Sequence, residues 1–437
     1  MFFKDRGMQA LVITNVLGNV IRLLSNLLIA HFLSPEAFAI TGLATTVIFA
    51  FNMISDGGFR AFILKHQHGD EAEVLNTLWT IKFIRNVFLI VLMFSFSGVI
   101  ADFFEVQELS LVLQVLCLVF LFDGLMPIGF IAIERQNKIA TVMYIRFAAT
   151  LLSILLMVVA VYYVRNYWPI VFSMVLNQVF QVAFAYFFVG KAGTAFGVDK
   201  DIFKEFMGWV RYIIPSSIIT LVLAQFDKVV LGKSLTTEEL GLYFVAFNFS
   251  AAAATFTIEY ARGVLQPYLS IVYRENPEQY LQTYYAKKQK ICVLLAFLIG
   301  GLSGASFLFF DVLYDERYLE AGYYLAILLV TPVMTLVTYS SEVTLILYGR
   351  LKATVEVNVI RMVWFLGGAW VGVYFFGVPG LLVVIALQEF WPAVYMAIRL
   401  KMFNAISIHK ELLILASGVV GFVLGRFGSE VIMRGGL

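Results

Sequence analysis

The sequence predicts an all-α membrane protein built as two six-helix bundles followed by an additional C-terminal helix. Three observations lead to this fold class. Of the 437 residues, 61% are hydrophobic and only 14% are charged, whereas soluble domains have about 45–50% apolar and 25% charged residues. The Lys and Arg residues gather on one side of the expected spans, and part of the first half recurs in the second. A soluble globular domain is excluded.

Apolar stretches long enough to cross a bilayer, which takes about 20 residues, recur along the whole chain. The first, GMQALVITNVLGNVIRLLSNLLIAHFL, is too long for the core of a signal peptide, so we expect it to remain as a span. We expect helices over residues 8–31, 37–58, 77–101, 108–132, 139–163, 168–190, 207–231, 239–262, 288–312, 320–346, 353–376, 379–400 and 410–433. Arg426, Ser429 and Glu430 interrupt the last stretch, which is therefore either a short span or a helix lying on the membrane.

The Lys and Arg residues are distributed unequally between the two sides of these spans. With the N-terminus in the cytoplasm, 21 of them fall on the cytoplasmic side, including Lys4, Lys82, Arg85 and Lys288. Only four fall on the outer side: Arg165, Lys228, Lys233 and Arg317. Because cytoplasmic loops carry an excess of Lys and Arg, the sequence predicts a cytoplasmic N-terminus.

An internal repeat predicts the domain organisation. LLIAHFLSPEAFAITGLA at 27–44 aligns without gaps on VVLGKSLTTEELGLYFVA at 229–246, and two further groups of matches follow in the same order. Halves with six spans each enter the membrane in the same orientation, which relates them by an axis along the membrane normal. We expect bundles over 1–190 and 207–402, a cytoplasmic linker over 191–206 and a membrane-associated helix over 403–437.

One line of polar residues runs along the first span. Asn15, Asn19, Arg22 and Asn26 are spaced by four, three and four residues, which places them on one helix face. An arginine at mid-bilayer costs roughly 2.5–3.5 kcal/mol on insertion scales, so we expect Arg22 to face a wet cavity. The alternative is a buried arginine paired with an acid for packing alone.

Three more arginines, Arg146, Arg262 and Arg361, lie within or at the ends of expected spans. We interpret these groups as the lining of a cavity that receives an anion, because the planar guanidinium forms paired hydrogen bonds with phosphate. Local ion pairs, Asp56 with Arg60 and Glu259 with Arg262, are the alternative. Further residues expected in the cavity are Gln178 and Gln388, and those expected at its cytoplasmic mouth are Arg60, Arg135 and Arg350.

Several kinds of site are not supported by the sequence. It has no G-x-x-x-x-G-K-[ST] loop for ATP and no H-E-x-x-H metal pattern. Cys117 and Cys292 both sit in apolar stretches without metal-ligand spacing. No basic face suited to nucleic acid stands out. We therefore expect no cofactor, no catalytic metal, no nucleic-acid partner and no enzymatic activity.

The chain resembles the polysaccharide-transporter group of bacterial oligosaccharide flippases, in the superfamily that also contains multidrug and toxic-compound extrusion transporters and lipid II flippases. The resembling residues include LLIAHFLSPEAFAITGLA, SDGGFRAFILK with LNTLWTIKFIRN, and FDKVVLGKSLTTEELGLYFVA. The segment after Met402 departs from this group, which commonly has about twelve spans.

The resemblance implies a multi-pass protein of the bacterial inner membrane that moves undecaprenyl-diphosphate-linked oligosaccharide to the outer leaflet by alternating access. Arg22, Asn19, Asn26, Arg146, Arg262 and Arg361 are then candidate diphosphate or sugar contacts. Asp56, Glu259 and Glu389 are candidates for the coupling ion. Membrane lipids and a polymerase or export complex of the same pathway are candidate partners. A cation-coupled multidrug exporter and a membrane-embedded polysaccharide polymerase or ligase remain as alternatives.

Overall fold

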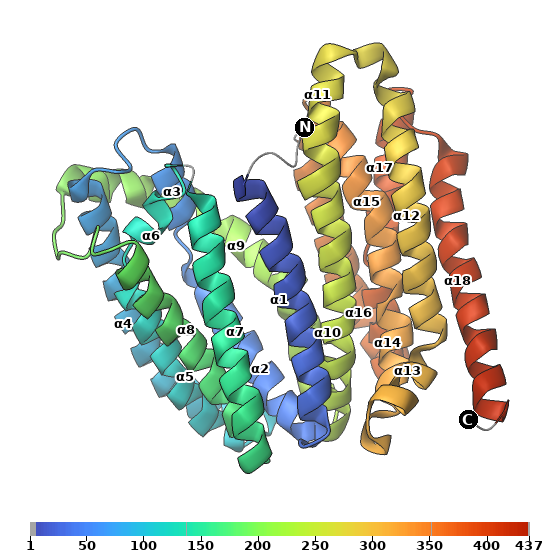
Figure 1. Cartoon of the computed structure of the whole chain (residues 1–437), viewed down its shortest axis with the longest axis horizontal. Coiled ribbons are helices and arrows are strands. Elements are labelled where there is room, and N and C mark those ends of the chain that lie inside the picture. Colours follow the sequence, from blue (N-terminus) through green and yellow to red (C-terminus); the bar gives the residue numbers. More distant parts are fainter. Residues whose placement is uncertain (1–5, 137, 351, 436–437) are drawn as a thin grey trace. The chain divides into compact units, whose positions relative to one another are not determined.

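The computed structural model describes residues 6–136, 138–350 and 352–435, and all regular elements among them are helices (Figure 1). Lys4, which the orientation argument includes, lies outside these residues. Within these described ranges, ten helices are long and apolar enough to span a membrane, or eleven if a pair of helices bent by 67° counts as one span. Thr14–Ala30 in the first helix is a further apolar helical stretch, shorter than these ten. The prediction of an all-α polytopic membrane protein is confirmed.

Contacts divide the chain into two compact units, Met1–Gly241 and Leu242–Leu437. The helices of the first unit are α1 (Arg6–Ala30), α2 (Pro35–Ser55), α3 (Phe59–Lys65), α4 (Ala72–Phe104), α5 (Glu108–Leu125), α6 (Gly129–Ala132), α7 (Ile139–Tyr163), α8 (Trp168–Phe188) and α9 (Lys200–Ser234). By these contacts α9 belongs to the first unit, whereas the sequence repeat assigns 207–231 to the second bundle.

Helix α10 (Thr237–Glu259) leads into the second unit. The helices that follow are η2 (Tyr260–Leu265), α11 (Gln266–Glu275), η3 (Pro277–Gln279), α12 (Tyr280–Gly304), α13 (Ser306–Leu313), η4 (Glu316–Tyr318), α14 (Ala321–Leu328), α15 (Val330–Leu347), α16 (Lys352–Ala386), α17 (Phe390–Lys401) and α18 (Ile408–Gly435). The helix expected over 410–433 is therefore present, and α18 is long and apolar enough to be a span.

Within the first unit, α1 packs along α7, α7 along α8, and α4 along α5, while α2 packs against α9 (Figure 1). The helix predicted over 37–58 is present as α2, which is itself long and apolar enough to be a span and stops three residues earlier than predicted. Helix α2 ends at Ser55, and Gly58 adopts a positive φ of 67° before α3 begins. The Asp56 carboxylate accepts a hydrogen bond from the Gly58 backbone N–H at 2.9 Å and stabilises this turn.

Helices in the second unit contain local irregularities. The helix expected over 239–262 continues through the π-helical turn η2 into α11. Gly377 has φ 62° and ψ −146° and interrupts α16, at the position where we predicted a connection between two spans. The span expected over 379–400 is interrupted between Ala386 and Phe390, so polar backbone groups become available at this depth.

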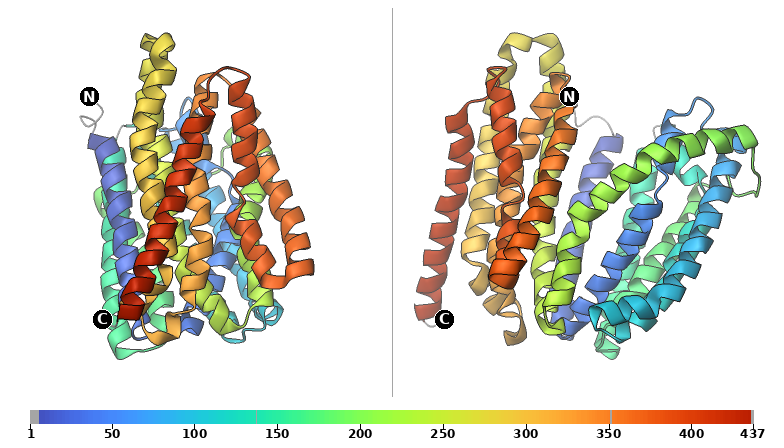
Figure 2. Two further views of the ribbon diagram at one scale, coloured as in Figure 1. Left: turned by 90° about the vertical axis from the view of Figure 1, so that its right-hand side faces the viewer. Right: turned by 180° about the vertical axis from the view of Figure 1, so that it is seen from behind.

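Helix α18 packs closely along α12 (Figure 2). A Cβ atom added at Gly300 would lie 2.0 Å from the Gly418 carbonyl oxygen, and one at Gly425 would lie 2.2 Å from that of Gly301. Small residues allow the backbones of membrane helices to approach in this way. The glycine seam therefore makes α18 an integral part of the second unit.

A buried ion pair joins the same two helices near the start of α18. The Lys288 ammonium donates to both Glu411 carboxylate oxygens at 2.6 Å and to the Tyr284 hydroxyl at 2.9 Å. The Lys288 side chain is 0% exposed and that of Glu411 is 8% exposed. The additional helix thus supplies the counter-charge for a lysine in the core of this unit.

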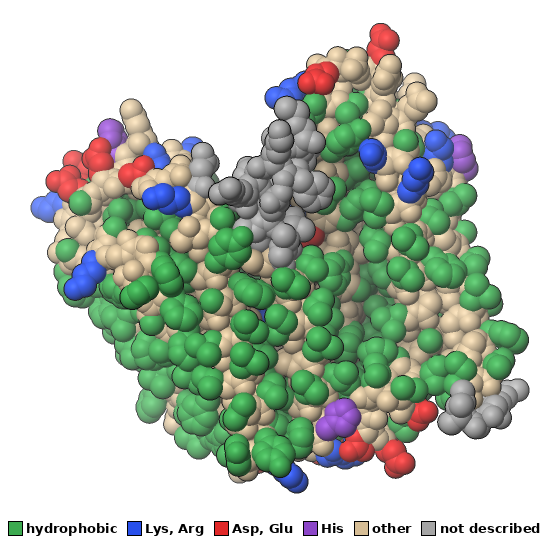
Figure 3. Space-filling view, viewed as in Figure 1, with side chains coloured by type: hydrophobic (Ala, Val, Ile, Leu, Met, Phe, Trp, Pro, Cys, Tyr) green, Lys and Arg blue, Asp and Glu red, His purple; other side chains and the backbone are tan. Residues whose placement is uncertain are grey.

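On each unit, charged side chains gather at the two ends of the helices and hydrophobic side chains cover the length between them (Figure 3). This distribution is the one expected of membrane spans. Lys82 and Lys288, which the orientation argument counts on the cytoplasmic side, are buried within α4 and α12. Arg85 also lies within α4 and is partly buried.

Candidate anion-binding site

Arg22 lies on a face of α1 that is exposed but is not the apolar face. The exposed leucine and valine side chains Leu17, Val20, Leu24 and Leu28 share one face. Since each residue advances the helix by about 100°, Arg22 lies roughly opposite to Val20 and Leu24. The Arg22 side chain is exposed, and no described residue forms an ion pair or a side-chain hydrogen bond with it. The guanidinium therefore points away from the apolar stripe without a counter-charge.

Arg146 on α7, which packs against α1, follows the same pattern. Its side chain is exposed, while Leu155, Val159 and Tyr162 are exposed on roughly the opposite face of α7. The guanidinium carbon lies 5.7 Å from the centre of the Phe130 ring. No carboxylate in the described part of the chain lies within ion-pair distance, although Glu134 is near enough to interact electrostatically.

Glu134 is instead bound by Arg60. A terminal nitrogen of Arg60 lies 2.7 Å from a Glu134 oxygen; the arginine side chain is 62% exposed and the acid 3%. The local pair between Asp56 and Arg60 that we considered from sequence is thus not formed. Arg135 donates to the carbonyl oxygens of Ile63 and His66 and so stabilises the connection after α3.

A second polar cluster in the first unit surrounds Asp123 of α5. Its carboxylate accepts hydrogen bonds from Lys82 at 3.1 Å, Asn86 at 3.0 Å and Gln178 at 3.4 Å. Gln178, which we expected in the cavity, therefore also contributes to helix packing. The sequence analysis did not connect these residues, because they come from three different helices.

Arg85 is a polar group of α4 that the site prediction missed. It donates to the Ser55 hydroxyl at 2.8 and 3.0 Å and to the Asn52 side-chain oxygen at 3.3 Å. These acceptors lie in the last turn of α2, where the helix dipole favours a cation. The spacing of Lys82, Arg85 and Asn86 by three and four residues, which indicates one polar helix face, was the sequence signal that could have identified Arg85.

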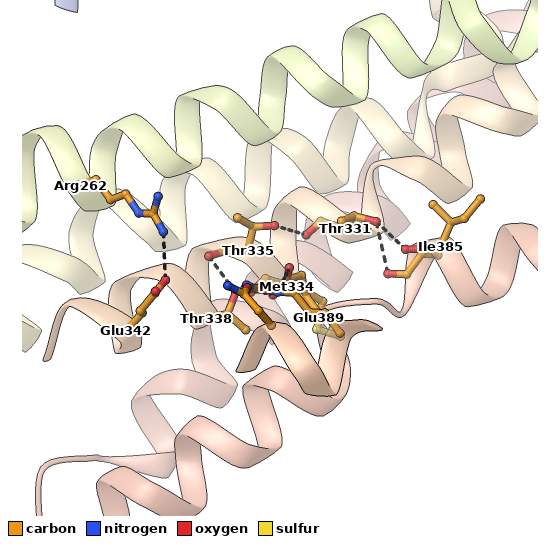
Figure 4. A network of polar contacts seen from close by, with 11 residues as sticks. Arg262, Thr331, Met334, Thr335, Thr338, Glu342, Ile385 and Glu389 are labelled. Carbon is orange, nitrogen blue, oxygen red and sulfur yellow. Dashed lines mark hydrogen bonds and ion pairs between the residues drawn. The ribbon is translucent and has the colours of Figure 1, made fainter. Parts of the chain in front are cut away.

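In the second unit, Arg262 reaches from η2 to Glu342 of α15 (Figure 4). One guanidinium nitrogen lies 3.3 Å from a Glu342 oxygen; the arginine side chain is 52% exposed and the acid 3%. The guanidinium carbon is 4.8 Å from the Tyr339 ring centre. The local pair of Glu259 with Arg262 is therefore replaced by a contact between helices.

Arg361 is more completely compensated than Arg262. Two of its guanidinium nitrogens donate to the two Glu389 oxygens at 2.8 and 2.9 Å, and a third donates to Asn358 at 2.9 Å. Both side chains are buried. The Arg361 guanidinium also lies 5.1 Å from the Tyr339 ring centre, so one ring contacts both arginines of the cluster.

Comparison with known proteins identifies the family. The family model described as polysaccharide biosynthesis protein matches residues 28–323. The chain belongs to this family. TuaB, the teichuronic acid biosynthesis protein of Bacillus subtilis (strain 168), is 24% identical over 303 residues, which cover 68% of this chain and 62% of TuaB. The resemblance to polysaccharide transporters stated from sequence is confirmed.

Solved structures show the fold of this family member. The chain superposes on the lipid II flippase MurJ in an inward closed conformation with a TM-score of 0.73 and 11% identity, covering 97% of this chain and 98% of MurJ. The chain superposes on an inward-facing multidrug resistance transporter of the MOP superfamily with a TM-score of 0.62 and 15% identity, and the match covers 96% of each chain. The family is therefore that of the polysaccharide biosynthesis proteins, and the fold is the one seen in MurJ and in this multidrug resistance transporter.

The remaining predicted site residues have varied surroundings. Glu259 forms no ion pair within the described ranges, and Gln388 and Asn19 are partly buried. Asn26 is partly buried on α1. The Arg350 guanidinium lies 4.9 Å from the Phe403 ring centre. Arg262 and Arg361 thus both contact the Tyr339 ring. A role of these residues in substrate binding stays a prediction.

Proposed function

We propose that the chain is a flippase that moves undecaprenyl-diphosphate-linked oligosaccharide from the cytoplasmic to the outer leaflet of the bacterial inner membrane by alternating access. The product supplies the synthesis of a surface polysaccharide. In this orientation the N-terminus is cytoplasmic. The proposal is supported by the family, by the transporter fold and by the basic groups of the first unit.

One observation carries this proposal. Arg22 and Arg146 expose guanidinium groups on the faces of α1 and α7 opposite to the apolar stripes, with no carboxylate at ion-pair distance among the described residues. A charged group without a counter-charge is unfavourable inside a membrane. A bound diphosphate supplies that charge and accepts charge-assisted hydrogen bonds from both arginines. An anionic headgroup is therefore the substrate chemistry that best fits these positions.

The other predicted residues receive narrower roles. Arg262 becomes a diphosphate contact when it exchanges Glu342 for the ligand, since half of its side chain is exposed. Arg361 would have to break two hydrogen bonds to Glu389 first. Asn19, Asn26 and Gln388 are proposed contacts for the sugar, and Arg60, Arg135 and Arg350 remain proposed residues of the cytoplasmic mouth. Asp56, Glu259 and Glu389 remain proposed sites for a coupling ion.

The proposal is tested by replacing the chromosomal gene with Arg22→Ala and measuring surface polysaccharide and undecaprenyl-linked intermediates. We expect surface polysaccharide to be lost and the intermediates to accumulate while the protein still inserts. Arg274→Ala changes an exposed arginine near the end of α11 and serves as the matched control. Normal export by a well-expressed Arg22→Ala protein would contradict the assigned contact.

The second candidate function is a cation-coupled multidrug exporter, because the chain also shares its fold with a multidrug resistance transporter. Such a transporter needs acids that are free to attract a cationic drug. Asp123, Glu342 and Glu389 are each within ion-pair distance of Lys or Arg, whereas Asp56 and Glu259 have no such pair among the described residues. A drug-hypersensitive strain expressing the protein distinguishes the candidates, because only the exporter raises the tolerated drug concentration.

A further inference from the structure

We propose that Glu342 takes up one proton when a diphosphate binds Arg262, which makes this carboxylate the proton-coupling group of the second unit. This inference rests on the proposed function, since it requires a diphosphate at Arg262. It assigns the proton to a residue outside the set Asp56, Glu259 and Glu389. The argument comes from the unequal exposure and bonding of the two ion pairs around Tyr339.

The ion pair of Arg262 with Glu342 is held more weakly than the neighbouring ion pair of Arg361 with Glu389. It has a single close approach of 3.3 Å, whereas Arg361 and Glu389 share two hydrogen bonds of 2.8 and 2.9 Å. The side chain of Arg262 is half exposed, but that of Glu342 is almost entirely buried. An anion arriving from solution can therefore reach the arginine but not its acid.

The local helix geometry of Arg262 also favours a change of partner. Arg262 lies within the π-helical turn η2, which is followed directly by α11 with Pro267 in its first turn. π-Helical turns are rare and concentrate at functional sites, and proline removes a backbone hydrogen bond. In the paired state the guanidinium carbon also lies 4.8 Å from the Tyr339 ring centre, a cation–π contact that is given up together with the ion pair when Arg262 moves to an anion.

The departure of Arg262 would leave Glu342 as a buried carboxylate without its counter-charge. Such a group is strongly disfavoured and becomes neutral instead. Arg361, the other cation at Tyr339, remains engaged with Glu389. The further titratable groups of the helices packed on this part of α15 are Tyr260, Tyr280, Tyr284, Lys288 and Glu411, together with Glu389 and Arg361.

These further groups offer Glu342 no free cation. Lys288 is bound to Glu411 and Tyr284, and the Tyr280 hydroxyl donates to Thr344. A proton therefore moves from water at the exposed side of Arg262 to a Glu342 carboxylate oxygen, giving a carboxylic acid. When the diphosphate leaves, Arg262 returns, the acid releases this proton to water, and no other bond changes.

The test is calorimetric titration of the purified full-length protein with farnesyl diphosphate in two buffers of different ionisation enthalpy. The difference in apparent enthalpy gives the number of protons taken up. We expect about one proton per bound diphosphate for the natural protein and none for Glu342→Gln. Because Glu342→Gln removes the competing carboxylate, its affinity should rise by about ten-fold rather than fall. Glu430→Gln, in an exposed pair with Arg426, is the control and should leave the proton count unchanged.

The outcomes separate the two proposals. Binding by the natural protein without proton uptake overturns this inference and leaves the proposed function standing, whereas absence of binding overturns both. Loss of proton uptake in Glu389→Gln rather than Glu342→Gln also overturns it. If Glu342→Gln does not fold, Arg262→Gln decides, because this variant should lose the uptake of one proton; uptake of one proton by Arg262→Gln overturns the inference.

Discussion

The ion pair of Lys288 with Glu411 allows a quantitative prediction about the additional helix. Glu411→Gln removes the negative charge that accepts two hydrogen bonds of 2.6 Å from Lys288, and leaves the ammonium with neutral acceptors alone, one amide oxygen and the Tyr284 hydroxyl. Lys288 is fully buried, so water cannot replace the lost partner. Breaking a buried pair in this way costs about 3–5 kcal/mol. We expect the free energy of unfolding to fall by that amount.

The measurement is the unfolding of detergent-solubilised protein, followed by the accessibility of Cys292, which is buried at 0% exposure beside α15 and α18. The double variant Lys288→Met/Glu411→Met removes both charges and should recover most of the lost stability, since replacing a buried pair by apolar residues is often neutral. The reasoning is refuted if Glu411→Gln unfolds like the natural protein, or if the double variant is no more stable than Glu411→Gln.

Two further predictions concern packing within each unit. Gly425→Ala should lower the free energy of unfolding by about 1–3 kcal/mol, because its Cβ would lie 2.2 Å from the Gly301 carbonyl oxygen. Gly428→Ala on the same helix meets nothing within 4 Å and is the control; equal thermal unfolding of the two variants would contradict the seam. Asp123→Asn should reduce the monodisperse fraction in size-exclusion chromatography, because Lys82 loses its carboxylate, and Lys82→Met should restore it. An unchanged elution profile for Asp123→Asn would count against that pair.

Much of the fold could be predicted from sequence because span formation depends on local composition. The expected helix over 139–163 coincides with α7, and the stretch at 410–433 forms α18 despite Arg426 and Glu430. Those two residues are four apart and pair with each other at 2.8 Å. The break after Ala386 was missed, since apolar residues continue on both sides of it. Its stability depends on contacts from another helix, such as Thr331 donating to the Ile385 carbonyl oxygen.

The candidate site could be predicted only in part for a related reason. Helical spacing correctly placed Arg22 with Asn15, Asn19 and Asn26 on α1, because a helix face is a local property. The counter-charges could not be predicted in this way. Glu342 is 80 residues from Arg262, and Glu411 is 123 residues from Lys288. Which arginines are compensated and which are free is therefore known only from the fold.

The central claim is that Arg22 and Arg146 host a diphosphate, and equilibrium binding of farnesyl diphosphate to the purified protein tests it most directly. Each charge-assisted hydrogen bond contributes about 1.5–3 kcal/mol, so Arg22→Ala and Arg146→Ala should each raise Kd by about ten- to a hundred-fold. Arg274→Ala should leave Kd unchanged. Natural affinity in the double variant Arg22→Ala/Arg146→Ala would contradict the account.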